Sequence, residues 1–345
     1  MTSRDFRTDE NAAFERPRRR TRPRTKDRPD YSRAEVGMVV TVDRGRFRVL
    51  LDGAEITATK ARQLGRTGVI VGDRVRLVGD TSGEEGTLAR IVEVEERATV
   101  LRRTADDDDP YERPIVANAD QLVIVTALAD PPPRTGMIDR ILVAGFDAGL
   151  APLLCLTKAD LAGPEELVAQ YRPLGVPVQT VQPGADLDEL RAALASHRSV
   201  FVGHSGVGKS TLVNALIPDA HRAIGSVNEV TGRGRHTSTS AIALRLPPFP
   251  TDSSPGDDDD GDGSWVIDTP GVRSFGLSHV TRESLIAAFA DLSAITQDCP
   301  RGCSHETGAP ECALDAAVAG GELSGPRLES FRRMLDSGPG LSRHS

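Results

Sequence analysis

Two hydrophobic patterns divide the chain, and the first predicts a small barrel. From residue 34 to about residue 101, short runs alternate apolar and polar side chains, and turn-forming pairs such as Asp52-Gly53 and Ser82-Gly83 separate them. The runs predict strands at 36–42, 46–51, 68–78 and 88–94. Four or five short strands in so few residues predict a β-barrel, with an OB-fold as the best match.

The second pattern follows an acidic run at 106–109 and alternates buried strands with amphipathic helices. It predicts strands at 121–126, 151–157, 177–181, 239–246 and 264–268, and helices at 137–148, 164–171 and 187–196. Such alternation predicts a mainly parallel sheet with helices on both faces, in which Cys155 is a core residue. Residues 247–263, rich in Pro, Asp, Gly and Ser, read as a surface insertion.

A phosphate-binding motif lies between the strand pattern at 199–202 and a helical pattern. The motif, GHSGVGKS, matches GxxxxGK[ST] in the strand–loop–helix context that it requires. Its glycines let backbone N–H groups surround a phosphate, Lys209 is expected to reach the β- and γ-phosphates, and Ser210 to ligate Mg²⁺. A chance glycine-rich turn would have to match every position. The predicted contacts are Gly203, His204, Ser205, Gly206, Val207, Gly208, Lys209, Ser210 and Thr211.

Two further motifs follow predicted strands and specify the nucleotide. Asp268-Thr-Pro-Gly271 matches DxxG, in which Asp268 holds Mg²⁺ and the Gly271 N–H contacts the γ-phosphate. Thr157-Lys158-Ala159-Asp160 matches [N/T]KxD, with Thr157 where Asn is more usual. The Asp160 carboxylate can accept from guanine N1–H and from its exocyclic amine, a donor pair that adenine lacks. The three motifs together predict a GTP site.

The order of the motifs is unusual. GTPases ordinarily run from the phosphate loop through DxxG to [N/T]KxD, whereas here [N/T]KxD comes first and DxxG last. The chain is therefore predicted to be a circularly permuted GTPase, since permutation preserves the site when domain termini lie close together.

The segment between the phosphate loop and DxxG supplies the candidate catalytic residue. GRGRHTST, at 232–239, is a switch I candidate in which Thr237, or otherwise Thr239, completes the Mg²⁺ shell. Val272 follows DxxG where many GTPases place a water-orienting Gln. His236 is the predicted substitute, and His204 is a weaker alternative.

Three of the four cysteines and one histidine form a short cluster near the C-terminus. Cys299, Cys303, His305 and Cys312 follow the pattern C-x₃-C-x-H-x₆-C. Three thiolates and an imidazole predict a closed structural Zn²⁺ site, and flanking helices are predicted at 314–319 and 326–335.

Charge and composition predict a basic N-terminal tail and a location in the cell. The net charge is −8, but residues 1–30 hold ten Arg or Lys against six Asp or Glu, which predicts a disordered basic tail. Arg62, Arg66, Arg74 and Arg76 are candidates to face RNA. No apolar run approaches membrane-spanning length and no signal peptide pattern follows the N-terminus, so the expected location is the cytoplasm.

The chain resembles the ribosome small-subunit-dependent GTPase A (RsgA) family over roughly residues 35–335. The resemblance rests on the barrel, the permuted motifs and the Cys₃His cluster together. Asn118-Ala119-Asp120 and His236-Thr237 add to the similarity. The resemblance implies GTP hydrolysis stimulated by the small (30S) ribosomal subunit during its late maturation, contact with 16S rRNA, and His236 as the catalytic group. The base-contacting loop near Gln182 and the Asp-rich insertion depart from the family pattern.

The sequence thus predicts a monomer of four parts. They are a disordered basic tail (1–33), an OB-fold barrel (34–103), a circularly permuted α/β GTPase domain (111–280) and a helical zinc-knuckle domain (281–338). GTP is the expected substrate, with Mg²⁺ and one structural Zn²⁺. Two alternatives stay open: a GTP-gated RNA-binding assembly factor whose hydrolysis is incidental, and a zinc-stabilised nucleic-acid-binding protein with a vestigial nucleotide site.

Overall fold

The computed structural model describes most of the chain between residues 30 and 336. The described residues are 30–65, 68–104, 111–218, 220, 241–248, 263–271, 275–277 and 280–336. The predicted basic tail up to residue 29, both acidic runs and the switch I candidate lie outside them. Among the described residues, no helix combines the length and the apolar character needed to cross a membrane.

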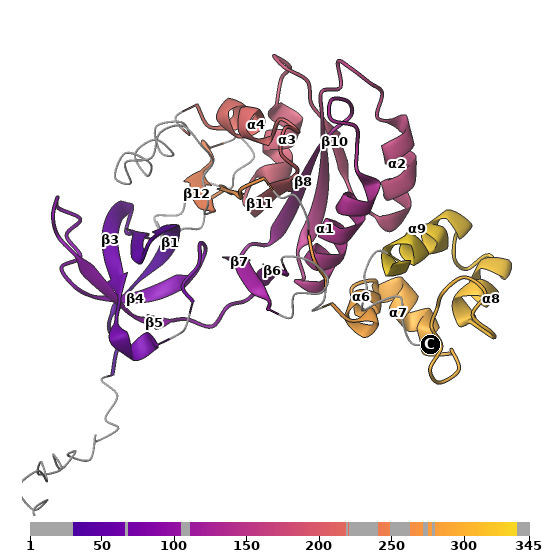
Figure 1. Cartoon of the computed structure of the whole chain (residues 1–345), viewed down its shortest axis with the longest axis horizontal. Coiled ribbons are helices and arrows are strands. Elements are labelled where there is room, and N and C mark those ends of the chain that lie inside the picture. The colour runs from indigo at the N-terminus through magenta and orange to yellow at the C-terminus, as the bar shows by residue number, and fades with distance from the viewer. Residues whose placement is uncertain are drawn as a thin grey trace, which may run out of the picture. The chain divides into compact units, whose positions relative to one another are not determined.

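Five strands close into the N-terminal barrel. They are β1 (Glu35–Asp43), β2 (Arg46–Leu51), β3 (Ala54–Lys60), β4 (Arg74–Gly79) and β5 (Ala89–Val94). Their pairing order is β1-β2-β3-β5-β4, and β4 returns to β1, which confirms the OB-type barrel (Figure 1). Gly37 lets β1 lie close to β2, because a Cβ at this position would be only 2.5 Å from the Leu50 carbonyl oxygen. A short 3₁₀ turn, η1 (Arg62–Leu64), follows β3.

The central sheet confirms the predicted α/β architecture. Its order is β10-β9-β8-β11-β13-β12, and all pairs are parallel except that between β13 and β12. The strands are β8 (Gln121–Ala127), β9 (Ala151–Thr157), β10 (Val178–Thr180), β11 (Arg198–Gly203), β12 (Ile242–Arg245) and β13 (Trp265–Asp268). β12 also pairs with β1 at Thr41, which makes the barrel and the central sheet hydrogen-bonded neighbours.

Helices cover both faces of this sheet. The helices are α1 (Thr135–Asp147), α2 (Glu165–Tyr171), α3 (Asp188–Leu194) and α4 (Lys209–Leu216), and η2 (Arg172–Leu174) extends α2. Along β8, Leu122 and Ile124 join the core that includes α1 and α2, whereas Val123 and Val125 join the core that includes α3 and α4. Cys155 lies fully buried in the second core, as predicted, and burial raises the pKa of its thiol to about 12.

Several elements differ from the sequence prediction. β6 (Val100–Arg103) lies in the range predicted for the barrel but pairs with β7 (Arg113–Ala117) in a separate two-stranded sheet. Two short helices, α6 (Arg282–Ala287) and α7 (Ala290–Thr296), precede the cysteine cluster where none was predicted. A capping box between Thr281 and Ser284 starts α6. The predicted helices after the cluster are α8 (Ala313–Ala319) and α9 (Gly325–Asp336).

Candidate active site and metal centre

Three loops meet at one edge of the central sheet. β11 leads into the phosphate-loop motif, β9 ends at Thr157 and β13 ends at Asp268. Because β9, β8, β11 and β13 are adjacent and parallel, their carboxyl ends lie along the same edge. The permuted order along the chain therefore still brings all three motifs to one place.

The backbone of the phosphate-loop motif forms a tight turn into a helix. Gly206 and Gly208 have φ angles of 86° and 88°, a left-handed conformation that side chains disfavour. A Cβ on Gly203 would lie 2.4 Å from the carbonyl oxygen of Val125. α4 begins directly after Gly208, so its unpaired N–H groups point toward the loop. This is the geometry that anion binding at a helix start requires.

Lys209 joins the phosphate loop to the DxxG element. Its side chain is only 6% exposed, and its ammonium group donates to the Asp268 carboxylate and to the carbonyl oxygen of Thr269. The Thr269 hydroxyl in turn donates to the Phe201 carbonyl oxygen of β11 at 2.6 Å. A Cβ on Gly271 would lie 3.3 Å from the backbone N of Ser205. DxxG and the phosphate loop therefore touch through both side chain and backbone.

Thr157, where Asn is more usual, also supports the phosphate loop. Its buried hydroxyl lies 2.5 Å from the carbonyl oxygen of Val207 and 3.3 Å from that of Thr126. The hydroxyl therefore ties the strand end of β9 to the turn before α4. The shorter threonine side chain is therefore long enough to contact the phosphate loop at the position where Asn is more usual.

The other two residues of the [N/T]KxD element face outward. Lys158 has a φ of 58°, and its ammonium group donates to the carbonyl oxygen of Asp130 in the loop after β8. Asp160 is exposed, so its carboxylate is accessible to a ligand. Sequence reasoning did not single out Asp130, although three prolines directly after it mark an ordered turn.

We expect Thr157→Val to weaken GTP binding roughly fivefold, or about 1 kcal/mol, because valine keeps the shape but cannot donate to the Val207 carbonyl. A fluorescent GTP analogue measures the dissociation constant. Thr59→Val, on β3 of the barrel and outside the nucleotide site, is the matched control and should bind normally. Equal affinity for the Thr157 variant and the wild type would show that the contact contributes nothing to the loop.

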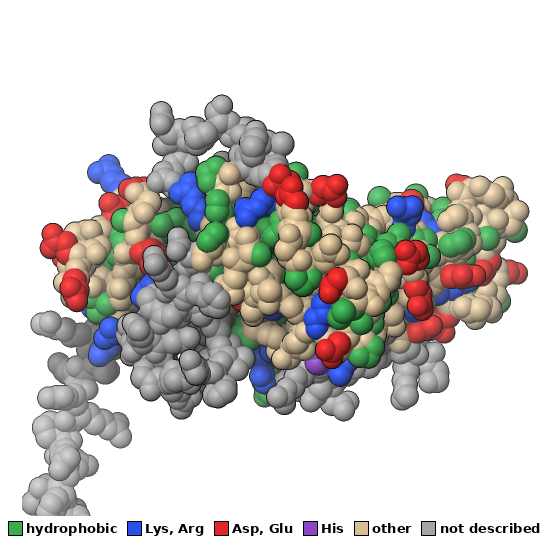
Figure 2. All heavy atoms as spheres, turned by 90° about the horizontal axis from the view of Figure 1, so that it is seen from above, with side chains coloured by type: hydrophobic (Ala, Val, Ile, Leu, Met, Phe, Trp, Pro, Cys, Tyr) green, Lys and Arg blue, Asp and Glu red, His purple; other side chains and the backbone are tan. Residues whose placement is uncertain are grey.

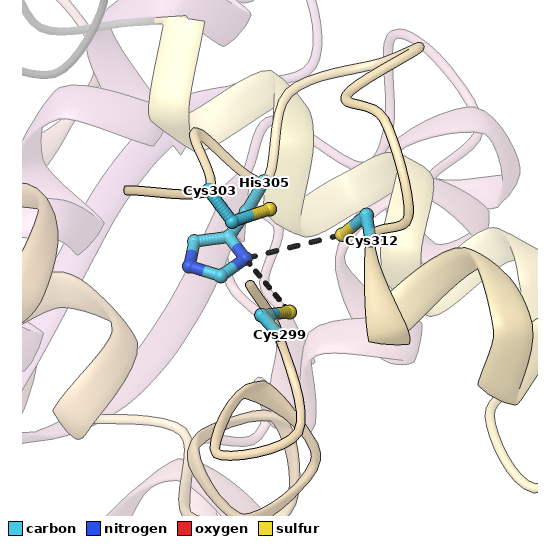
Figure 3. Close-up of side chains that lie close together, drawn as sticks. All are labelled: Cys299, Cys303, His305 and Cys312. Atoms are coloured by element: carbon cyan, nitrogen blue, oxygen red, sulfur yellow. Dashed lines mark hydrogen bonds between the residues drawn. The ribbon is translucent and has the colours of Figure 1, made fainter. Parts of the chain in front are cut away.

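The cysteine cluster brings four ligand atoms together in the C-terminal helical region. The Sγ atoms of Cys299, Cys303 and Cys312 and a ring nitrogen of His305 all lie within 4.8 Å of one another (Figure 3). The Nδ1 atom of His305 is 3.6 Å from Cys299 Sγ and 3.9 Å from Cys312 Sγ. Tetrahedral zinc with Zn–S bonds of about 2.3 Å and Zn–N bonds of about 2.0 Å spaces its ligand atoms about 3.5–3.8 Å apart. The donor set and the spacing therefore fit a structural zinc ion.

The surroundings of the cluster suit a cation. The backbone N–H of Ala313 donates to Cys299 Sγ at 3.3 Å, and Arg332 donates to the carbonyl oxygen of His305 at 3.0 Å. Burial lowers the pKa of His305, with Arg282 and Arg332 acting in the same direction, which keeps the imidazole neutral as a ligand. Burial raises the pKa of the Cys312 thiol to about 11, so a bound cation must favour the thiolate.

A family model and several known proteins match this chain. The model described as RsgA GTPase matches residues 94–278, more than half of the sequence. The chain belongs to the RsgA GTPase family. The matched range contains all three nucleotide motifs, in the permuted order already described.

Curated members of the RsgA family align over much of the chain. The protein of Pseudomonas aeruginosa strain LESB58 named small ribosomal subunit biogenesis GTPase RsgA is 43% identical over 236 residues. That match covers 66% of this chain, and the chain spans 65% of that relative's length. The protein of the same name from Azotobacter vinelandii is 39% identical over 280 residues, covering 79% of this chain and 75% of that protein.

Solved structures support the fold. YjeQ from Thermotoga maritima aligns with a TM-score of 0.63 at 26% identity, over 90% of this chain and 99% of YjeQ. YloQ, described as a circularly permuted GTPase, aligns with a TM-score of 0.59 at 24% identity, over 90% of this chain and 97% of YloQ. The multidomain, circularly permuted fold predicted from the sequence is thereby confirmed.

Some residues predicted for the RsgA-type site lie outside the described part of the chain. These are His236, Thr237 and Thr239 of the switch I candidate, and Val272 after DxxG; Arg66, a predicted RNA contact, also lies outside it. His204 is described: its Nδ1 lies 2.8 Å from the Ser205 carbonyl oxygen. It lines a small pocket beside the phosphate loop together with Pro131 and Met137.

Proposed function

We propose that the chain is a GTP hydrolase that acts on the small ribosomal subunit during its late maturation. The observation that carries the proposal is the meeting of Lys209, Asp268 and the Ser205–Gly271 contact at the helix start of α4. The names of the curated relatives supply the ribosomal part of the proposal.

Each residue has a distinct role in this proposal. Lys209 and the loop N–H groups hold the β- and γ-phosphates and stabilise the charge that develops as water attacks in line. Ser210, Asp268 and Thr237 would hold Mg²⁺, which would neutralise part of the charge on the phosphates. His236 orients the attacking water in place of the usual Gln. The remaining loop contacts, Gly203, His204, Ser205, Gly206, Val207, Gly208 and Thr211, surround the phosphates.

Asp160 selects guanine, with Thr157 and Lys158 fixing the loop that carries it. We expect Asp160→Asn to weaken GTP binding by about two orders of magnitude and to favour the xanthine nucleotide, because an amide can donate to the xanthine oxygen. Competition between GTP and XTP measures the change. Asp147→Asn, an exposed carboxylate at the end of α1, is the control and should leave the preference for GTP intact. Unchanged preference in the Asp160 variant would remove this residue from base recognition.

One structural Zn²⁺ held by Cys299, Cys303, His305 and Cys312 completes the set of cofactors. Its role in the proposal is to fold the segment between α7 and α8, which is rich in turns. Zinc takes no part in hydrolysis because its four protein ligands fill a tetrahedral shell.

The barrel is the proposed contact with 16S rRNA, although not through every arginine suggested by the sequence. Arg74 and Arg76 form ion pairs with Glu95, and Arg76 also with Glu93, so their charge is largely neutralised. Arg62 remains exposed, as do Arg46 and Arg90. On the face that Figure 2 shows, acidic and basic side chains are interspersed over the described surface. These exposed barrel arginines are therefore the proposed rRNA contacts.

Sedimentation with purified ribosomal subunits tests the partner. The proposal expects the chain, acting as a cytoplasmic monomer, to pellet with small subunits in a non-hydrolysable GTP analogue and much less in GDP. Large subunits serve as the control. Equal binding to both subunits, or to neither, would contradict the proposed partner.

A further inference from the structure

Helix α1 holds the segment that leaves the DxxG element. The Nε of Arg140, near the middle of α1, donates to the carbonyl oxygen of Phe275 at 2.6 Å. Phe275 lies four residues beyond Gly271 in the sequence and is buried in the same core as Ile138 and Ile141 of α1. The exit from DxxG is therefore fixed to α1 by a charged hydrogen bond as well as by apolar packing.

Residues 275–277 also pair with the backbone at the end of β6. Gly276 and Thr104 exchange two backbone hydrogen bonds of 3.2 Å and 3.3 Å. Thr104 directly follows β6, and Leu277 is fully buried. Residues 275–277 are thus attached both to α1 and to the connection that follows the barrel.

The residue next to Arg140 attaches α1 to the C-terminal helices. Asp139 is 1% exposed, and its carboxylate accepts from Arg333 of α9 at 3.0 Å. The Arg333 guanidinium also lies 5.4 Å from the centre of the Tyr171 ring. Burial raises the pKa of Asp139 and Arg333 opposes this, so loss of Arg333 would leave a carboxyl group that is costly to ionise.

Aromatic packing makes the attachment of α1 to the C-terminal helices rigid. The Phe146 ring of α1 lies 4.5 Å from that of Phe289, which precedes α7, and Phe289 packs edge-on against Phe331 of α9 at 5.6 Å. A helix moves as a unit over a few turns, because its backbone hydrogen bonds fix each residue relative to the next. A shift at Phe275 would therefore be carried through Arg140 and Asp139 to α9.

We propose that Arg140 is a positioning residue for the DxxG element, and that Arg140, Asp139 and Arg333 couple this element to α9 of the C-terminal helical region. The inference rests on the proposed function, since GTP is the ligand that DxxG would sense. It predicts that nucleotide state changes the stability of α9, and that contacts made by the C-terminal helices alter hydrolysis. Coupling between two sites of this kind is typically 5–150-fold.

Hydrogen exchange on the full-length, zinc-loaded protein tests the coupling. The wild type is expected to show different amide protection over residues 325–336 with GDP and with a non-hydrolysable GTP analogue. Arg140→Ala should abolish that difference, and Arg140→Lys should retain part of it because lysine still donates one bond.

A control variant separates coupling from simple loosening of α9. Ser330→Ala removes the hydrogen bond that α9 donates to the Gln170 carbonyl oxygen of α2 at 3.1 Å, a contact that does not involve α1. It should lower protection of α9 equally in both nucleotide states, leaving the difference in place. Arg333→Ala should abolish the difference, and the Arg140/Arg333 double variant should lose no more than either single variant.

The kinetic readout is the ratio of subunit-stimulated to basal kcat, which should fall about tenfold in Arg140→Ala. An α9 exchange difference that persists in this variant, or is absent from the wild type with GTP bound, would overturn the coupling alone. A wild type that is not stimulated by small subunits but shows the exchange difference would contradict the proposed function and support the coupling. A wild type that fails to bind GTP would overturn both.

Discussion

Lys209→Ala is expected to lower the rate of GTP hydrolysis by roughly 10²–10³-fold, because the ammonium group is the one side-chain cation placed among the loop N–H groups of the described site. Its present partners, the Asp268 carboxylate and the Thr269 carbonyl, place it between the loop and the DxxG element. Weaker GTP binding should accompany the slower rate. Single-turnover hydrolysis with saturating GTP separates the two effects.

The control for this variant must show that the fold survives. Removing Lys209 leaves Asp268 without its partner, so a lower melting temperature is expected alongside the loss of activity. Lys60→Ala, on β3 of the barrel, removes a lysine outside the site and should hydrolyse GTP normally. A folded Lys209 variant with wild-type hydrolysis would show that phosphoryl transfer takes place elsewhere.

The second large effect concerns the metal. Cys312→Ser is expected to reduce the zinc content from one ion per chain to nearly none and to unfold the region around α8. Structural zinc contributes about 10–16 kcal/mol of apparent binding energy in small zinc domains, far more than these short helices can replace. Elemental analysis gives the zinc content, and protection from proteolysis at residues 299–320 reports the fold.

Cys155→Ala is the matched control for zinc. It removes the only cysteine that lies outside the cluster, which is buried in the core of the central sheet. This variant should keep its zinc while losing some global stability from the small cavity it creates. Zinc retained in Cys312→Ser, or absent from wild type purified with zinc present, would contradict the Cys₃His assignment.

Local sequence patterns predict most of the fold and the positions of the motifs. The glycines of the phosphate loop, the buried runs of β8 and β9, and the Cys₃His spacing all encode structure within a few residues, so the sequence predicts them directly. The barrel could be predicted from alternation and turns, and the pairing of β4 with β1 confirms that it closes.

Long-range contacts could not be predicted in the same way. Arg140 and Phe275 are 135 residues apart, and Asp139 and Arg333 are 194 apart, so no local pattern connects them. Helices α6 and α7 depend on such contacts, because α6 packs against α1 and α7 packs against α6 and α8. The β6–β7 pairing spans the acidic run, which reads as a boundary rather than as a hairpin connection.

Steady-state hydrolysis of GTP and ATP, with and without purified small ribosomal subunits, tests the central claim most directly. The permuted site and the RsgA family membership predict slow hydrolysis of GTP alone, strong stimulation by small subunits, and no stimulation of ATP hydrolysis or by large subunits. GTP hydrolysis that small subunits leave unchanged would contradict the proposed ribosomal role while leaving the nucleotide site in place. Equal hydrolysis of ATP and GTP would contradict guanine selection by Asp160.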